Sequence, residues 1–362
     1  MSFMRNSWYC AGWSTEVADK PVHRKILGEE IVLYRTESGK VIALGDKCPH
    51  RFAPLHQGRI KGENLECPYH GLQFGGDGKC VFNPHGEGKI PRSAKTDAFI
   101  LEERGGALWI WMGEPEKADP EQIIETEFLA DKTFVSRTGY HPVGGNYMLV
   151  VDNLLDLTHA QFLHPETVFG KGSADRWQVS KTGKPSEGGE EVMQEVWFEE
   201  TEDTMTAHQM MRNKPKPPLW DPIVDYEMTD LHSWITWYAP SNLRLTLELS
   251  ERGSNEGPAT MIVMHFLTPI DEFNCYYFFA IGWDTNIEDQ EAADRVLGIV
   301  LQTIIDEDGP IVEDCQAYMG ETSDLFSLRP VLLPTDGVAV KARRRLEELI
   351  QDEQEQAKVA AE

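Results

Sequence analysis

The chain has 362 residues, and its 60 acidic and 34 basic side chains give a formal net charge of −26 at pH 7. This length predicts about two domains, each with its own core, and the hydrophobic fraction of 41% is typical of a globular protein. The negative charge argues against a nucleic-acid partner, and the absence of a run of about 18 apolar residues argues against a membrane span. The N-terminal segment 1–6 lacks the apolar core of a secretory signal, so we expect a cytoplasmic protein.

The first part of the chain is predicted to be an all-β domain. β-prone runs between residues 25 and 44 are separated by glycines and charged turn residues, and residues 108–112 have the pattern of a last, buried strand. Residues 115–120 combine turn and charged residues without periodicity, which is typical of a linker. We therefore predict two domains, spanning residues 1–117 and 118–362.

Two short loops in the first domain each combine one cysteine with one histidine. Cys48 and His50 form a C-x-H pair, and after sixteen residues Cys67 and His70 form a C-x-x-H pair. Zinc sites usually place two cysteines in one half-site and two histidines in the other, whereas a Rieske [2Fe–2S] cluster has two thiolates on one iron and two imidazoles on the other. The mixed loops therefore favour a Rieske cluster, with a zinc knuckle as the alternative. Because imidazoles raise the reduction potential, this cluster could accept electrons from a ferredoxin or flavin reductase.

A second group of metal-ligand residues follows in the segment 151–165. Its apolar spacing predicts a helix that ends at Pro165. Asp156 and His159 would share a face of this helix, but His159 and His164 are five residues apart and so about 140° out of phase. Both can contact one metal only if the helix widens by a π-type turn or breaks between them. Two histidines and a carboxylate form the facial triad of non-haem Fe(II) oxygenases; ordinary core or surface histidines are the alternative.

The remaining chain predicts an antiparallel sheet followed by a long helix, so the fold class is α+β. Between residues 234 and 283, aromatic runs and an alternating apolar pattern predict three or four strands. Residues 288–319 have the apolar spacing of a helix, and the segment from residue 336 onward predicts a charged helix. A third, carboxylate ligand could come from the acidic residues of the first helix: Asp306, Glu307, Asp308, Glu313 and Asp314.

The two motifs together resemble the oxygenase component of Rieske non-haem iron oxygenases, and in particular the aromatic monooxygenases of the vanillate and dicamba O-demethylase type. The resemblance covers essentially the whole chain and is carried by four stretches: His50–Leu55, Cys67–Leu72, Asn83–Gly86 and Val151–His159. It implies an N-terminal all-β Rieske [2Fe–2S] domain followed by a helix-grip catalytic domain, in which an antiparallel sheet curves against a long C-terminal helix.

The resemblance also implies the ligands of a mononuclear Fe(II). The family motif D-x2-H-x4-H falls on Asp156, His159 and His164, whose two histidines would bind the iron. The third ligand in the family is the aspartate of a Glu-Asp pair before a short apolar stretch, which points to Asp308. Asp306 and Asp314 remain its rivals.

In this family the leading aspartate is not a ligand, but connects an iron-ligand histidine to a cluster histidine of the neighbouring subunit. Carried over, Asp156 would link His159 to His70 of the next chain, and the resemblance implies a homotrimer. Electrons would come from NAD(P)H through a separate flavin- or ferredoxin-type reductase. O₂ and a small aromatic compound would be the substrates.

The substrate residues are less sharply indicated. His265 is a polar residue in an apolar strand and matches a carboxylate-binding position of the dicamba enzyme, with a satisfied core histidine as the alternative. Trp234 and Asn153 are further candidates, and the segments 170–190 and 212–226 are candidate lids. We expect hydroxylation of a methyl C–H, which O-demethylates a vanillate-like methoxylated aromatic acid and releases formaldehyde. The alternatives are an N-demethylase or ring hydroxylase on the same scaffold and, in another class, a Rieske-type electron carrier without oxygenase activity.

Overall fold

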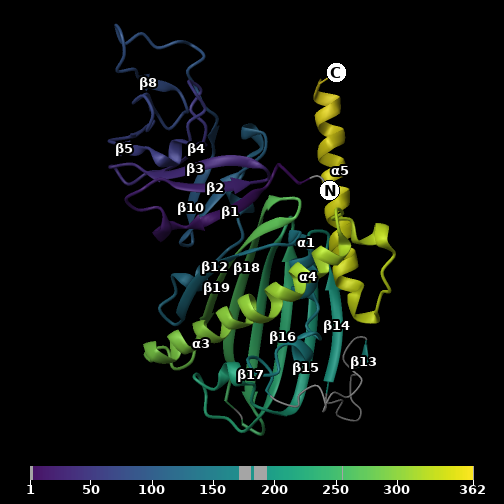
Figure 1. Ribbon diagram of the computed structural model, residues 1–362. Coiled ribbons are helices and arrows are strands. Elements are labelled where there is room, and N and C mark those ends of the chain that lie inside the picture. Colours follow the sequence, from purple (N-terminus) through teal and green to yellow (C-terminus); the bar gives the residue numbers. More distant parts are fainter. Residues whose placement is uncertain (1–2, 171–180, 183–193, 255, 362) are drawn as a thin grey trace. The chain divides into compact units, whose positions relative to one another are not determined.

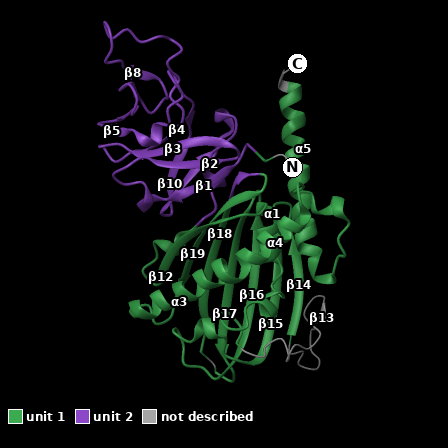
Figure 2. Ribbon diagram, viewed as in Figure 1, with its two compact units in different colours: residues 1–4, 126–267, 272–362 green, residues 5–125, 268–271 purple. Residues whose placement is uncertain are grey.

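The structure, a computed structural model, describes residues 3–170, 181–182, 194–254 and 256–361. They form two compact units, which Figure 2 distinguishes by colour. The smaller unit comprises residues 5–125 and 268–271, and the other described residues belong to the larger unit. The domain boundary at residue 117 stays a prediction; it coincides with the end of the short 3-10 helix η3 (Pro115–Lys117), before the chain enters the larger unit.

The smaller unit is all-β, as its sequence predicts. One sheet has the order β1-β11-β10, with strands Trp8–Trp13, Ala107–Trp111 and Leu101–Arg104. A second has the order β2-β3-β4-β9, with strands Val22–Ile26, Glu29–Arg35, Val41–Gly45 and Ala98–Phe99. The third has the order β5-β6-β7-β8, with strands Arg59–Lys61, Asn64–Glu66, Gln73–Phe74 and Cys80–Phe82. Strands β1 and β11 are rich in tryptophan, and all their residues are buried.

The larger unit is built on an eight-stranded sheet of order β12-β19-β18-β17-β16-β15-β14-β13 (Figure 1). Its strands are Val135–Val143, Asn274–Trp283, Ala259–Asp271, Asn242–Glu251, Met228–Tyr238, Thr204–Pro215, Gln194–Glu200 and Lys181–Thr182, in the same order. Successive strands from β14 to β18 pair antiparallel with one another, β12 pairs antiparallel with β19, and β13 pairs parallel with β14. The sequence pattern correctly predicted strands between residues 234 and 283, but the sheet has eight strands rather than the three or four predicted.

Helices pack on one face of this sheet, and the last of them extends beyond the sheet toward the C-terminus (Figure 1). They are α1 (Tyr147–Leu155), α2 (Ala160–Leu163), α3 (Gln290–Gln302), α4 (Gly309–Met319) and α5 (Gly337–Ala361). Helices α3 and α4 lie across the sheet in Figure 1 and are joined by a π-helical turn at Thr303–Asp308. The remaining short 3-10 helices are Ser14–Glu16, Leu55–Gln57, Pro120–Gln122, Glu127–Leu129, Pro218–Trp220, Leu325–Leu328 and Pro334–Asp336. The α+β class and the sheet-plus-helix arrangement are confirmed.

The predicted helix over residues 151–165 needs a correction. Helix α1 ends at Leu155, and only one further helical turn, α2, follows before Pro165. The break has a local cause, because the Asp156 carboxylate accepts hydrogen bonds from the Thr158 amide, at 2.9 Å, and from the Thr158 hydroxyl. A side chain that bonds its own backbone two residues on competes with the helical ladder and turns the chain.

A buried ion pair fixes α5 to α1. The guanidinium of Arg343 is almost fully buried, and its Nε lies 2.9 and 2.8 Å from the two carboxylate oxygens of Asp152. Burial raises the pKa of Asp152, and the charge of Arg343 opposes that effect. Because Asp152 belongs to α1, the pair helps hold the helix that leads into the histidine segment.

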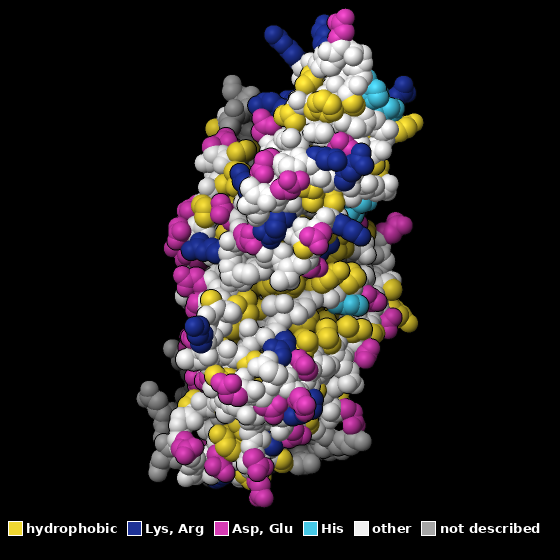
Figure 3. All heavy atoms as spheres, turned by 90° about the vertical axis from the view of Figure 1, so that its left-hand side faces the viewer, with side chains coloured by type: hydrophobic (Ala, Val, Ile, Leu, Met, Phe, Trp, Pro, Cys, Tyr) yellow, Lys and Arg dark blue, Asp and Glu magenta, His cyan; other side chains and the backbone are white. Residues whose placement is uncertain are grey.

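Charge is dispersed rather than concentrated. On the face shown in Figure 3, acidic side chains lie singly or in small groups with basic ones between them, so the charge of −26 makes no single continuous patch there. Among the described residues, no helix combines the length and the apolarity that a membrane crossing requires.

Candidate active site

Two histidines are brought together by the single turn α2. His159 occupies its N-cap and His164 its C-cap, where φ −116° and ψ 46° end the helix. This unwinding corrects the phase difference that an ideal helix would impose, and the two Nε2 atoms lie 3.2 Å apart. Of the two possibilities left open by the sequence, a break therefore positions these side chains, and it lies at both ends of α2 rather than within it.

Asp308 joins the two histidines at the end of the π turn. Its Oδ1 lies 3.1 Å from Nε2 of His164 and 3.5 Å from Nε2 of His159. The rivals Asp306 and Asp314 are exposed, and neither belongs to this group. Pro310 follows closely; it has no N–H and its ring crowds the preceding turn, so a widened turn before it is expected.

Hydrogen bonds orient the three side chains toward one another. His164 Nδ1 lies 2.7 Å from Oε2 of Glu307, which also accepts a hydrogen bond from Thr167. His159 Nδ1 contacts the main-chain carbonyl of Asp156. When these Nδ1 atoms carry the protons, both Nε2 lone pairs face Asp308 Oδ1, and three electron-pair donors converge on one point.

This convergence favours a positive charge at the site. Although burial works against it, the Asp308 carboxylate raises the pKa of His159. Burial likewise opposes ionisation of Asp308, but hydrogen bonds from the two histidines hold the pKa of this carboxyl below its usual range. A set of two neutral imidazoles and one carboxylate fits a non-haem Fe(II), which leaves other coordination positions open.

Glu307 and Asn153 complete the surroundings of the three side chains. Sequence reasoning named Glu307 only as one of several acidic residues, although its place beside Asp308 in the Glu-Asp pair was a usable signal. Asn153, predicted as a substrate residue, donates a hydrogen bond of 3.0 Å from Nδ2 to Oδ1 of Asp308. It thus contacts the metal-ligand group from α1, and it does not line the apolar cavity described next.

An apolar cavity of about 150 Å³ opens beside the three side chains. It is lined mainly by aliphatic and aromatic residues of the sheet, α3 and the segment before Trp220. Its polar side chains are Gln209, Ser233, His265, Tyr277 and Thr303, besides His159, His164 and Asp308. Gln209 and Ser233 are directly opposite each other on β15 and β16. No lysine or arginine lines the cavity within the part of the chain that is described.

Two nitrogen atoms at this cavity lack a hydrogen-bond partner among the described residues. They are Nε2 of His265 and Nε2 of Gln209, and both side chains are almost fully buried. His265 Nδ1 lies 2.7 Å from the hydroxyl of Tyr277, and burial lowers the pKa of His265 to about 3. His265 is therefore neutral, and buried polar atoms without partners are costly unless a ligand satisfies them.

The structure does not bring Trp234 to this cavity, which corrects its predicted place. Side chains alternate along β16, so Ser233 and Ile235 face the cavity and Trp234 faces away from it. Its ring packs on His232, with ring centroids 4.8 Å apart. Of the candidate lids, 212–226 contributes Pro217, Leu219 and Trp220 to the cavity, whereas most of 170–190 lies outside the described residues.

A second hollow, of about 630 Å³, borders His159 from another side. Asp156 and Asn153 also line it, together with apolar residues of α4 and of the segment before α5. Several of its apolar lining residues are exposed, including Phe162 of α2 at 60% and Val331 at 89%. His159 therefore lies between an open hollow and the buried cavity, whereas Asp156 lines the hollow but not the cavity.

The two Cys–His loops of the smaller unit close in the same way. The Cys48 amide bonds the Ala53 carbonyl and the Cys67 amide bonds the Leu72 carbonyl, at 3.0 and 2.8 Å. Gly71, at φ +70°, allows the second loop to return, because few side chains tolerate that conformation.

The four predicted cluster ligands come together at these loops. Both thiols are buried, and burial together with the neighbouring Cys67 raises the pKa of Cys48 to about 11. The His50 and His70 rings lie 4.5 Å apart, and His50 is exposed. Two adjacent inner thiols and two adjacent outer imidazoles fit a Rieske [2Fe–2S] cluster, whose irons have different ligands.

Comparison with known proteins agrees with this geometry. Residues 7–92 match the Rieske [2Fe-2S] domain and residues 143–352 match the vanillate O-demethylase oxygenase C-terminal domain. The chain is 33% identical to the dicamba O-demethylase oxygenase component of Stenotrophomonas maltophilia, over 97% of this chain and 99% of the relative. It is 32% identical to the chloroacetanilide N-alkylformylase oxygenase component of Rhizorhabdus wittichii, over 97% of each.

A solved structure is similar over nearly the whole chain. The crystal structure of dicamba monooxygenase with non-heme iron and dicamba superposes with a TM-score of 0.79 at 32% identity, covering 98% of this chain and 100% of that one.

The first prediction concerns the carboxylate ligand. Asp308→Asn removes the anionic donor, so we expect mononuclear iron affinity to fall by on the order of 10–100-fold or more, while the cluster is retained. Total iron, acid-labile sulfide and the visible spectrum of the purified protein measure both. Asp306→Asn removes an exposed charge from the same turn and serves as the control. Equal iron loss in both variants, or none in Asp308→Asn, would contradict the assignment.

Proposed function

Because this chain belongs to the vanillate O-demethylase family of Rieske oxygenases, we propose that it O-demethylates a methoxylated aromatic acid. It is the oxygenase component of an O₂-dependent monooxygenase, and its cofactors are a Rieske [2Fe–2S] cluster and a mononuclear non-haem iron. An oxygenase component works with a separate reductase. The zinc protein and the electron carrier considered from the sequence are therefore set aside.

In this proposal His159, His164 and Asp308 hold the mononuclear iron, and Cys48, His50, Cys67 and His70 hold the cluster. When bound, the cluster supplies single electrons and the iron supplies O₂ activation for hydroxylation of a C–H bond. With an aryl methyl ether, NAD(P)H, a proton and O₂, the products are a phenol, formaldehyde, water and NAD(P)⁺. The hydroxylated methyl group leaves as formaldehyde because a hemiacetal breaks down to these products.

The protein's own part is to hold the substrate and exclude water, and the unpaired donors of the cavity carry this proposal. If the Tyr277 hydroxyl donates to His265 Nδ1, the remaining proton of His265 is on Nε2, which becomes a donor. The Gln209 amide supplies another donor, and the Ser233 hydroxyl lies across the strand pair from it. A carboxylate that accepts two or three hydrogen bonds can stay ionised even where no cation is present. The apolar walls would then pack against the aromatic ring.

N-dealkylation is the second candidate, and one observation favours it. The cavity offers donors but no lysine or arginine among its described lining residues, so the carbonyl of a neutral amide would also satisfy it. A relative at 32% identity is a chloroacetanilide N-alkylformylase oxygenase component. Oxidation of an N-alkyl carbon requires the same C–H hydroxylation beside a heteroatom.

The neighbouring subunit is expected to complete the path of electrons. We propose that the loop tip of one copy docks in the hollow beside Asp156 and His159 of the next. The tip carries Phe52 and Tyr69, which are 69% and 64% exposed, and the hollow offers exposed apolar side chains. A head-to-tail contact of this kind uses different surfaces on each copy and makes a ring when its rotation closes, and the ring proposed here is a homotrimer.

A single turnover tests the reaction without the reductase. The protein is reduced anaerobically, mixed with methoxybenzoates, N-alkyl anilides or unsubstituted aromatics, and exposed to O₂. We expect formaldehyde and a phenol from a methoxybenzoate, in an amount limited by the reduced cluster. Dealkylated anilide without phenol would favour the second candidate, and ring hydroxylation without aldehyde would exclude both.

Gln209→Leu tests the anchoring of the acid group. Loss of a hydrogen bond to a charged group is worth about 1.5–3 kcal/mol, so we expect KM for the active methoxybenzoate to rise roughly tenfold or more. Gln194→Leu is a matched control, because Gln194 is also almost fully buried and its Nε2 has no partner among the described residues, but it does not line the cavity. An unchanged KM in Gln209→Leu would show that this amide does not hold substrate.

Asp156→Asn tests the bridge to His70. We expect both metals to remain bound, while oxidation of the reduced cluster in the presence of substrate and O₂ slows by about tenfold or more, as loss of a charged hydrogen bond implies. Stopped-flow absorbance of the cluster measures this rate. A cluster that is oxidised at the normal rate would remove Asp156 from the path.

Mixed oligomers provide the control for that experiment. Subunits with Asp308→Asn lack the iron site, and subunits with His70→Ala lack a cluster ligand. Activity that appears only after the two are mixed and reassembled requires electrons to cross between subunits. Mixed oligomers that remain inactive would contradict the proposed ring.

A further inference from the structure

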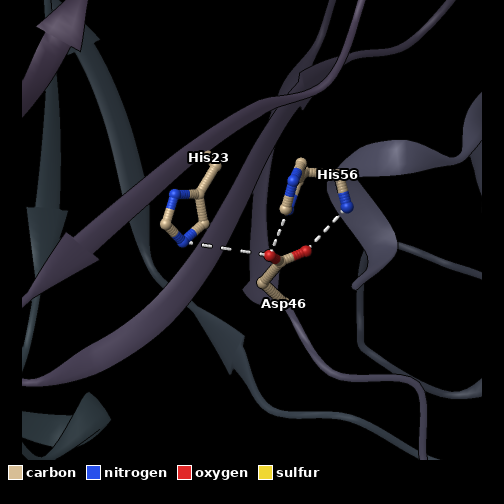
Figure 4. Close-up of side chains that lie close together, drawn as sticks. All are labelled: His23, Asp46 and His56. Atoms are coloured by element: carbon tan, nitrogen blue, oxygen red, sulfur yellow. Dashed lines mark hydrogen bonds and ion pairs between the residues drawn. The ribbon is translucent and has the colours of Figure 1, made fainter. Parts of the chain in front are cut away.

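A second group of metal-ligand side chains lies in the smaller unit, apart from the cluster ligands. His23 is on β2, Asp46 directly follows β4, and His56 is in the 3-10 helix Leu55–Gln57 (Figure 4). We propose that these three side chains, with Glu30 of β3, form a binding site for a divalent transition-metal ion such as Zn²⁺. This ion would be additional to the cluster and the mononuclear iron.

The distances between these side chains support the binding of one common ion. One potential ligand atom from each of His23, Asp46 and His56 lies within 4.8 Å of the other two. His23 Nε2 is 4.0 Å from Asp46 Oδ2 and 2.5 Å from Glu30 Oε2, while His56 Nδ1 contacts the same Oδ2 of Asp46. Two imidazoles and two carboxylates are a complete donor set for tetrahedral zinc. His23, Asp46 and His56 already lie close enough to share an ion, and Glu30 adjoins them through its contact with His23.

The charge around Asp46 points the same way. Its side chain is only 3% exposed, and its Oδ1 accepts a hydrogen bond of 2.6 Å from the His56 amide. That contact caps the 3-10 helix and leaves Oδ2 facing the two imidazoles, as Figure 4 shows. Within the described ranges, no lysine or arginine forms an ion pair with Asp46 or Glu30. Buried carboxylates are normally paired with a cation or coordinate a metal.

The site is open to solvent and placed where an ion would have a structural effect. The side chains of His23 and His56 are 39% and 30% exposed, so an ion can enter directly. Asp46 and His56 mark the two ends of the loop that carries Cys48 and His50. An ion bound there would tie both ends of this loop to β2 and β3, and we expect it to slow loss of the cluster.

Equilibrium dialysis of the holoenzyme against ZnCl₂, followed by zinc and iron analysis, tests the site. We expect one zinc per subunit beyond the unchanged iron content. His23→Gln removes a direct ligand, so its zinc affinity should fall by at least the roughly tenfold that loss of an outer partner costs. His141→Gln is the control, because His141 is a partly exposed histidine on β12 and belongs to neither histidine group.

Each outcome decides the proposal. Zinc that binds wild type and His141→Gln but not His23→Gln supports the site, and Glu30→Gln, an exposed substitution, should weaken binding in the same direction. Zinc that binds all variants equally, that displaces iron, or that does not bind at all overturns it. The half-life of the visible cluster absorbance at raised temperature, with and without ZnCl₂, tests the effect on the loop. Lengthening by zinc in wild type and His141→Gln but not in His23→Gln supports the effect, and no lengthening in wild type refutes it.

Discussion

The convergence of His159, His164 and Asp308 is the constraint on which the larger unit depends. Their three electron-pair donors come within 3.1–3.5 Å of one another although the segments are far apart in sequence. Lone pairs of two imidazoles and a carboxylate have no attraction for one another when no cation lies between them. The surrounding fold must therefore hold the three side chains in place. It does so with the Asp156 turn on one side and the π turn before Pro310 on the other. Both are departures from ideal helix geometry, and both place ligands that a regular helix would point elsewhere.

The same constraint explains the polar residues around the three ligands. Glu307 and the Asp156 carbonyl can accept hydrogen bonds from the Nδ1 atoms of His164 and His159, and Asn153 donates one to Asp308. The Nε2 lone pairs and the Asp308 carboxylate then face a single point. The cavity next to them has the opposite character. Nε2 of His265 and Nε2 of Gln209 have no partner among the described residues, which leaves them available to a ligand. The three ligands thus turn lone pairs toward one point, whereas the cavity turns polar nitrogen atoms toward the space that a ligand would fill.

Much of this could be read from the sequence, and the failures have physical causes. Strand β17 was predicted from the alternation of Leu243, Leu245, Leu247 and Leu249 with polar residues. The two loops were predicted from the spacing of the cysteines and histidines. Strand β15 alternates between buried and less buried residues, but one of its buried positions is the polar Gln209, and β14 does not alternate, so neither strand was predicted. The break at Asp156 depends on a side chain that outcompetes the helical ladder, which apolar periodicity does not register. Trp234 was misplaced because a shift of one residue along a strand exchanges the two faces of a sheet.

His159 is the residue that connects the cavity with the hollow on the surface. It lines both the enclosed cavity and the hollow beside Asp156, so its ring is the wall between the place for substrate and the surface where a second copy is proposed to dock. Its Nδ1 side is turned to the carbonyl of Asp156 and its Nε2 side to Asp308. Any change in the contact at Asp156 therefore acts directly on the ring that lines the cavity. This short connection gives docking and substrate binding a physical means to influence each other, because both would act on the orientation of one imidazole.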